Sequence, residues 1–333
     1  MATVTKSATG WRVQIRKKGI YKSGTFRTKA EAQMWANKIE SEINAGTYSN
    51  IPDITFADLI DKYIKEITVH KKSKREETLR LTRLAEMDIG KIKLAALTEQ
   101  DFIAWRDERL SKVKPASVIR EWNTLSHLLN TAVKEWKYLK INHLSHISKP
   151  KDPPPRTRRY SDEEIARLTF VSGYDENHMP LTVQSRVGAA MLFAIETAMR
   201  AGEICKATWQ DFNPTKRLLF IPQSKNGHSR TVPLSSKAIA IIERLAAIRT
   251  ADDDRIFQLN SASLDAIFRQ LKERAGLADA DLHFHDTRRE ALSRLSKKVE
   301  VLTLAKISGH RDLKILLNTY YAPDMAEIAD LLG

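Results

Sequence analysis

The stretch Thr197-Ala198-Met199-Arg200-Ala201-Gly202-Glu203-Ile204 follows a long apolar helical pattern and places an arginine where that helix is predicted to end. Three further segments of the last third also set basic side chains at element ends, namely Lys225-Asn226-Gly227-His228-Ser229-Arg230, His285-Asp286-Thr287-Arg288-Arg289 and Ser308-Gly309-His310-Arg311. A tyrosine pair, Tyr320 and Tyr321, comes just after them. Four cationic segments followed by tyrosines predict a site that binds and attacks a phosphate.

The chemistry of phosphoryl transfer explains why these residue types belong together. Negative charge develops on the phosphate oxygens outside the breaking bond, and guanidinium groups such as Arg200 and Arg288 stabilise it because they stay charged and donate bidentately. His285 stands three residues before Arg288, so a helix that opens at Asp286 would turn both side chains the same way. Tyrosine has an ordinary pKa of about 10 and needs positive charge or a base to attack. A lysine at a hairpin tip, Lys225, is placed to protonate the leaving deoxyribose oxygen.

The sequence contains none of the motifs that mark several other common classes of enzyme. The chain has no Walker glycine loop, dinucleotide fingerprint, HExxH helix or Gly-x-Ser-x-Gly elbow. No spacing of carboxylates suggests a two-metal site, so neither a cofactor nor a metal is expected. The single cysteine, Cys205, excludes an internal disulfide and an all-cysteine zinc site, and is expected in the core of a protein from a reducing cytoplasm.

The charge balance points to a polyanionic partner. Among 333 residues, 55 are Lys or Arg and 41 are Asp or Glu, which gives a formal charge of +14. Cations that neutralise phosphates release condensed counterions, so nucleic acid is the first expectation. No long apolar run, signal peptide or lipidation motif points to a membrane.

The first 50 residues are predicted to form a small basic module of two strands and a helix. Apolar and cationic side chains alternate over residues 10–27, and Thr28 with Glu31 forms the capping box of a helix that ends near residues 44–46. The excess charge favours a phosphate-binding surface. The candidate DNA contacts are Arg12, Arg16, Lys17 and Lys18.

Residues 54–148 are predicted to form a helical bundle. Thr55 and Thr98 cap two helices, and a longer one begins after Pro115 with a broad apolar stripe. The basic run at residues 70–75 lies between the first two helices. It fits a DNA contact and a solvated loop about equally well. Its candidate DNA contacts are Lys71, Lys72, Lys74 and Arg75.

A domain boundary is predicted at residues 149–159, where four prolines and five basic residues form an extended cationic linker. Its candidate DNA contacts are Arg156, Arg158 and Arg159. Residues 160–333 follow as a mixed, mainly helical domain with a cap at Ser161, two strands within 217–234 and a short amphipathic tail at 325–332. The expected fold class is thus mainly α with small β elements.

The ordered set of cationic segments resembles the tyrosine recombinase family, the phage-type site-specific integrases. The signature of that family runs arginine, hairpin lysine, His-x-x-Arg, a histidine or tryptophan, and tyrosine. The matching residues here are Arg200, Lys225, His285, Arg288, His310 and Tyr320. The likeness covers nearly the whole chain, strongly from about residue 156 and loosely before it.

The resemblance implies a DNA strand transferase of a phage or mobile element. Its tyrosine forms a 3′-phosphotyrosyl link, frees a 5′-hydroxyl and stores the bond energy for rejoining, so no ATP is needed; no metal is expected either. Residues 1–50 resemble an arm-type DNA-binding module and 54–148 a core-binding domain, which together with the linker imply a clamp around double-stranded DNA. The expected assembly is a tetramer on paired sites, with the tail packed on a neighbouring subunit or on its own domain. Further expected partners are DNA-bending or directionality proteins, and the expected location is the cytoplasm of a bacterial cell, at the nucleoid.

The chain departs from the family pattern in two places. Arg289 stands where a second histidine is common, and the gap from His310 to the tyrosines is one residue longer than usual. Tyr320 is chosen as nucleophile over Tyr321 because family nucleophiles often have a proline three residues later, which matches Pro323. Glu203 is expected to hold a nearby cation. His228 and Arg230 are expected to flank the hairpin without a catalytic part, with a phosphate contact as the alternative.

Two other functions remain open at this point. Taken singly, each of these residues also fits an ordinary structural position, such as a surface ion pair or a packed aromatic ring. A type IB topoisomerase would relax DNA with the same residues but without pairing two sites. A catalytically silent DNA-binding regulator would keep the fold, although the intact set of catalytic residue types argues against silence.

Overall fold

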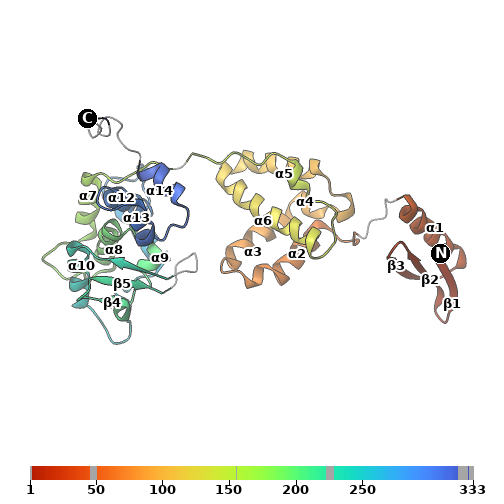
Figure 1. The fold of residues 1–333 in the computed structure, drawn as a ribbon, viewed down its shortest axis with the longest axis horizontal. Helices are drawn as coiled ribbons and strands as arrows, with labels where there is room; N and C mark the ends of the chain where they lie inside the picture. Colours follow the sequence, from red (N-terminus) through yellow and green to blue (C-terminus); the bar gives the residue numbers. More distant parts are fainter. Residues whose placement is uncertain (1, 46–50, 155, 223–228, 322–328, 330–333) are drawn as a thin grey trace. The chain divides into compact units, whose positions relative to one another are not determined.

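The computed structural model describes residues 2–45, 51–154, 156–222, 229–321 and 329, and Figure 1 shows their helices and strands. The chain forms two compact units, Met1–Pro155 and Arg156–Gly333. The predictions made for Lys225, His228 and Pro323, and for the tail at 325–332 apart from Ala329, fall outside the described residues.

The amino-terminal part of the first unit is a three-stranded antiparallel sheet packed against one helix. The elements are β1 (Ala2–Ser7), β2 (Gly10–Lys17), β3 (Ile20–Phe26) and α1 (Lys29–Ala45). Val13 and Ile15 of β2 are fully buried, as the alternation predicts, and the Thr28 cap is present. Strand β1 was not predicted, because it is a mostly polar edge strand whose one large apolar residue, Val4, pairs with Val13.

The rest of the first unit is the predicted helical bundle. Its helices are α2 (Phe56–Glu66), α3 (Lys74–Glu86), α4 (Asp88–Lys91), α5 (Glu99–Lys112) and α6 (Pro115–Lys134). The capping boxes at Thr55 and Thr98 are confirmed, and α6 begins at Pro115 as expected. The 3₁₀ turns are Thr68–His70, Leu94–Ala96 and His143–His146.

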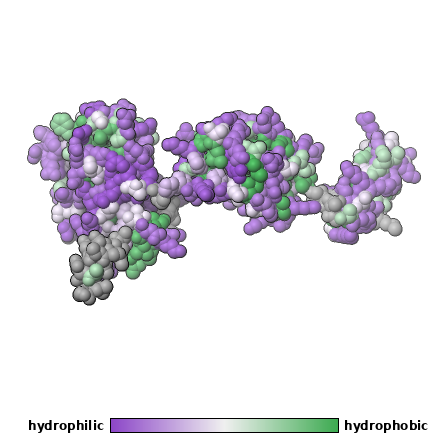
Figure 2. Space-filling view, turned by 90° about the horizontal axis from the view of Figure 1, so that it is seen from above, coloured by the Kyte–Doolittle hydropathy of each residue, from purple (hydrophilic) through white to green (hydrophobic). Residues whose placement is uncertain are grey.

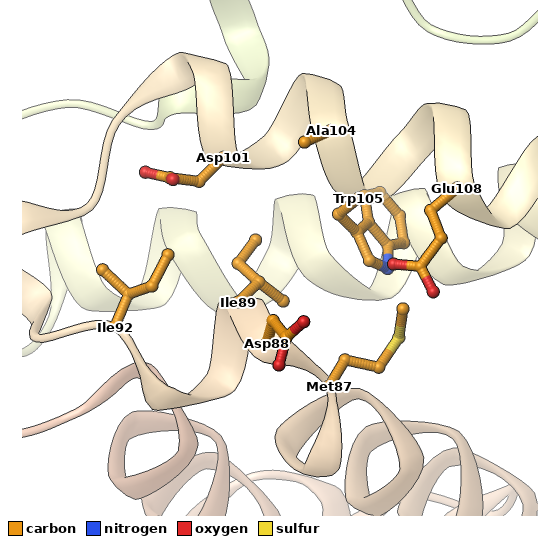
Figure 3. Close-up of a pocket in the computed structure, with 8 residues that line it drawn as sticks. All are labelled: Met87, Asp88, Ile89, Ile92, Asp101, Ala104, Trp105 and Glu108. Carbon is orange, nitrogen blue, oxygen red and sulfur yellow. The ribbon is translucent and has the colours of Figure 1, made fainter.

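A pocket of about 200 Å³ opens between α4 and α5 (Figure 3). Its lining combines apolar side chains with the carboxylates of Asp88, Asp101 and Glu108. It contains none of the cationic candidates, so a phosphate would meet repulsion rather than stabilisation there.

The second unit is a mainly helical domain with one small antiparallel sheet. Its helices are α7 (Asp162–Ser172), α8 (Val183–Thr197), α9 (Ala201–Ile204), α10 (Ser236–Ala246), α11 (Ser261–Arg274), α12 (Asp286–Ser296), α13 (Val301–Ser308) and α14 (Leu313–Tyr320). A 3₁₀ turn, Trp209–Asp211, precedes the sheet of β4 (Phe212–Asn213), β5 (Leu218–Ile221) and β6 (Arg230–Pro233). The two predicted strands are confirmed as β5 and β6, while β4 was too short to predict.

Helix α8 is the centre of this unit. It packs against α7, α10, α11 and α12, and most of its side chains are buried. A helix enclosed on so many sides is held rigidly by close packing, so its carboxyl end provides a fixed base for the residues that follow. Figure 2 shows a largely hydrophilic exterior, and no helix in the described part of the chain is long and apolar enough to cross a membrane.

Candidate active site

Arg200 lies at the junction between α8 and α9. Ala198 ends α8 in the left-handed region, with φ 54°, and Arg200 then caps the amino end of α9. Its backbone amide donates to Oε2 of Glu203 at 2.9 Å and its Nη1 donates to Oε1 at 3.0 Å. Among the described residues, Glu203 is the one hydrogen-bond partner of this guanidinium, so its remaining N–H groups can bind a phosphate.

Arg230, in strand β6, forms an ion pair with the same carboxylate. Its Nη1 and Nη2 donate to Glu203 Oε1 and Oε2 at 2.9 and 2.6 Å, and its Nε donates to the Ile307 carbonyl at 2.8 Å. The two side chains are only 7% and 6% exposed. Glu203 therefore holds two cations, where the sequence predicted one. Arg230 was predicted only to flank the hairpin or to contact phosphate, and its buried pair with Glu203 was not predicted. The signal was strand alternation, which puts Arg230 on the inward face with the buried Val232.

Arg288, in the first turn of α12, hydrogen-bonds the loop after α8 and the end of α13. It is 4% exposed, and its guanidinium donates to the carbonyls of Ala198 and, at 2.6 Å, Ser308. These carbonyls lie two residues before Arg200 and His310. Burial, followed by the nearby charge of Arg200, lowers the pKa of Arg288 to about 9, which leaves it protonated at neutral pH.

His310 follows the left-handed carboxyl cap of α13. Gly309 has φ 72°, and a β-carbon there would lie 3.2 Å from Cδ of Arg230, so glycine meets both a conformational and a packing requirement. His310 Nδ1 lies 2.7 Å from Oγ of Ser308, whose single hydroxyl proton is already directed to the Leu304 carbonyl at 2.6 Å. Nδ1 therefore carries the ring proton and Nε2 keeps its lone pair.

The two histidines are both held in their neutral form. Burial, followed by three neighbouring guanidinium groups, lowers the pKa of His310 to about 4. Partial desolvation, followed by the charge of Arg288, also lowers the pKa of His285, although this residue is exposed at the start of α12. A neutral imidazole at pH 7 can accept a proton.

The tyrosines differ in what their hydroxyl groups do. Tyr321 donates to the Val299 carbonyl at 2.5 Å, which is a structural contact. Within the described residues Tyr320 has no hydrogen bond; burial raises its pKa, and the charges of Arg289, Arg288 and Arg159 oppose that rise. Tyr320 is thus the tyrosine whose phenolate the surrounding charge would favour.

The five described catalytic candidates form one electrostatic cluster. The field of Arg288 reaches His285, His310 and Tyr320, and Arg200 reaches both histidines. A groove of about 720 Å³ opens beside His310, lined also by Arg230, Lys306 and Arg311. Such an arrangement can bind a phosphate, stabilise charge on it and take a proton from a nucleophile. Within the described residues, no group of histidine, cysteine and carboxylate side chains is arranged to hold a metal ion.

All but two of the predicted DNA contacts of the first unit are exposed, namely Arg12, Arg16, Lys18, Lys72, Lys74 and Arg75. Lys17 is half-buried. Lys71 instead donates to the Tyr63 hydroxyl at 2.8 Å and to Glu77 at 2.7 Å inside the bundle. A phosphate would have to compete with Glu77 for Lys71.

The described residues of the predicted linker form neither helix nor strand, and its three arginines all pair with carboxylates. Arg156 pairs with Asp281 and Asp286, Arg158 with Glu164, and Arg159 with Glu290. Each carboxylate lies in the second unit. The sequence alone did not reveal these pairs, since three of the four partners lie more than 120 residues away.

Comparison with known proteins identifies the family of the chain. The family model described as the phage integrase family matches residues 164–327. A Haemophilus influenzae protein named "Putative integrase/recombinase" is 53% identical over 98% of this chain and 89% of its own length. The Escherichia coli "Shufflon-specific DNA recombinase" is 31% identical over 80% of this chain and 68% of its own length.

Solved structures share the fold. A lambda integrase dimer bound to a core site matches 95% of this chain and 94% of its own with a TM-score of 0.64 at 17% identity. The Tn1549 transposon integrase bound to circular intermediate DNA matches 84% of this chain and 99% of its own with a TM-score of 0.68 at 18% identity. With a 53% identical relative matched over nearly its full length, the chain belongs to the phage integrase family of tyrosine recombinases, which act in DNA recombination.

Proposed function

We propose that this recombinase cleaves and rejoins specific double-stranded DNA sites through a 3′-phosphotyrosyl intermediate on Tyr320. The observation that carries the proposal is the contrast within the tyrosine pair. The Tyr320 hydroxyl has no hydrogen-bond partner among the described residues and faces the charge of three arginines, whereas the Tyr321 hydroxyl is occupied by Val299. A nucleophile must be unoccupied, and nearby positive charge stabilises the anion that it forms during attack.

In the proposed cleavage step, Oη of Tyr320 attacks the phosphorus, and the bond from phosphorus to the 5′-oxygen breaks. The phenol proton passes to a neutral imidazole, for which the Nε2 lone pair of His310 is suited. Arg200 binds the non-bridging oxygens, and the buried Arg288 adds charge while it holds the two loops. Lys225, from outside the described residues, is the proposed donor of a proton to the leaving 5′-oxygen.

Rejoining reverses these roles. A 5′-hydroxyl attacks the phosphotyrosine, its proton goes to the group that donated one in cleavage, and the phenol regains a proton from the imidazole. The energy of the cleaved bond stays in the phosphotyrosine, so the proposed reaction consumes no nucleotide, and the guanidinium groups supply the positive charge that a metal ion would otherwise provide.

The proposed partners are double-stranded DNA and further copies of the chain. The exposed cations of β2 and of the 72–75 segment supply a phosphate-binding surface. The proposal is supported by solved relatives that are described as an integrase dimer on a core site and a tetramer on a Holliday junction. We propose three functional parts, an arm-binding module (1–50), a core-binding bundle (54–148) and a catalytic domain (160–333), in a cytoplasmic protein that works at the nucleoid.

The test compares two isosteric variants on a nicked suicide substrate that traps the covalent adduct. Tyr320→Phe removes one oxygen and keeps the ring, so DNA affinity should persist while the adduct disappears. Tyr321→Phe is the matched control and should still form adduct. If the adduct instead persists in Tyr320→Phe and is lost in Tyr321→Phe, the assigned nucleophile is wrong; if it persists in the double variant, the tyrosine mechanism at this site is refuted.

The same protein preparation separates recombination from simple relaxation. A recombinase needs two paired sites for product, whereas a topoisomerase would relax a supercoiled plasmid that carries a single site. Relaxation without pairing would therefore favour the topoisomerase alternative, and DNA binding without any adduct would favour the silent regulator.

A further inference from the structure

Three side chains at the start of the second unit hydrogen-bond helix α12 and the loop before it. Arg156 donates through Nη1 to both oxygens of Asp281, at 2.9 and 2.7 Å, and through Nη2 to Oδ2 of Asp286 at 3.0 Å. Asp286 is the first residue of α12 and is 4% exposed. The hydroxyl of Tyr160 donates to the His283 carbonyl at 3.0 Å in the same loop.

Arg159 makes the second charged contact with this helix. Its Nε and Nη2 donate to Glu290 at 3.0 and 3.3 Å, and Glu290 is 3% exposed. Arg294 approaches the same carboxylate at 2.7 Å. We call Arg156, Arg159 and Tyr160 the clasp.

The carboxylates that the clasp holds lie on either side of a catalytic candidate. Asp286 precedes Arg288 by two residues and Glu290 follows it by two, and all three side chains are buried. Without Arg156 the buried Asp286 would lose its arginine partner, and an uncompensated buried carboxylate costs free energy that local rearrangement relieves. The position of the first turn of α12, with His285 and Arg288, therefore depends on residues that belong to the linker in sequence.

Arg158 stands between the two clasp arginines but does not share their contacts. Its guanidinium bonds Glu164, in the first turn of α7, and the carbonyl of its neighbour Arg159. The three arginines carry the same charge within four residues of chain. Arg156 and Arg159 contact α12, whereas Arg158 does not. Substitution of Arg158 therefore controls for the loss of one positive charge in this segment.

We infer that Arg156 and Arg159 are positioning residues that fasten the linker to the catalytic helix, rather than DNA-contacting residues. This inference rests on the proposed function, because it concerns the helix assigned to phosphate cleavage. The carboxyl end of the linker is thus bound to the helix that begins after His285 and carries Arg288.

The test uses the full chain with single substitutions at Arg156 and, as the control, at Arg158. For Arg156→Ala we expect the single-turnover rate of adduct formation at saturating suicide DNA to fall about 10- to 100-fold, the size of loss that follows misplacement of a catalytic group. The DNA dissociation constant and its salt dependence should match the unmodified protein. Arg156→Lys should recover part of the rate, because an ammonium can still reach one carboxylate. Arg158→Ala should lower the rate less than about 2-fold, as expected for an ion pair away from α12.

A DNA-contact role would give the opposite pattern. Loss of one phosphate contact lowers the slope of log affinity against log salt by about 0.9 and leaves the rate at saturating DNA unchanged. That result for Arg156→Ala, or equal effects of Arg156→Ala and Arg158→Ala, would overturn the inference.

A second measurement keeps the inference separate from the proposed function. If the unmodified protein forms no adduct, the proposed function fails, but hydrogen exchange still reports on the clasp. Arg156→Ala should then raise amide exchange across residues 283–296, and Arg158→Ala should not. Equal protection of this segment in both variants would refute the clasp without reference to activity.

Discussion

Glu203 offers a quantitative test of the active-site electrostatics. Its side chain is 6% exposed and lies between two guanidinium groups. Burial raises its pKa, but the hydrogen bonds from Arg230 and from the Arg200 backbone outweigh burial and lower the pKa from 4.5 to about 2. Glu203→Gln keeps the shape of the protonated acid and removes only the charge, so it isolates this contribution.

The expected loss follows from proton linkage. At about 1.4 kcal/mol per pH unit, a pKa lowered from 4.5 to about 2 corresponds to about 3 kcal/mol of unfolding free energy. Because the folded pKa is the lower one, this stabilisation is complete above pH 4.5 and is lost as the pH falls toward 2. The deficit of Glu203→Gln should thus be about 3 kcal/mol at pH 7 and shrink to about 1 kcal/mol at pH 3.

The assay is a urea titration read by hydrogen exchange in peptides of the second unit, so that unfolding of the first unit is not counted. The control is Glu163→Gln, whose exposed pair with Arg167 should be worth less than about 0.5 kcal/mol. A deficit below about 1 kcal/mol at pH 7, or one that is the same at both pH values, would refute the reasoning.

Two further predictions concern proton transfer. Lys225→Ala should slow adduct formation on a normal phosphodiester far more than on a 5′-phosphorothiolate, whose sulfur leaves without a proton; equal losses in single-turnover rates would remove Lys225 from the general-acid role. Since the pKa of His310 is lowered to about 4 from 6.5, the neutral base should persist as the pH falls, so the acid limb of the adduct-formation rate should lie below pH 6.5. A limb at or above pH 6.5 would contradict a neutral His310 as base.

Features that depend on neighbours in sequence could be predicted. The capping boxes at Thr28, Thr55, Thr98 and Ser161 join residues three apart, so their hydrogen bonds follow from local spacing. The alternation in β2 likewise identified its buried face. The order of the cationic segments pointed to the family, which the comparisons confirm.

What the sequence by itself determined is therefore the local elements, the mainly helical class and the residue types of a phosphate-transfer site. Tertiary structure decided which cations are free and which are occupied. Arg230 is buried against Glu203, Arg156 is held by a carboxylate 130 residues away, and the two tyrosine hydroxyl groups have different surroundings. Ion pairs between distant segments leave no periodic pattern in the chain, because their geometry exists only after α8, α12 and β6 have packed.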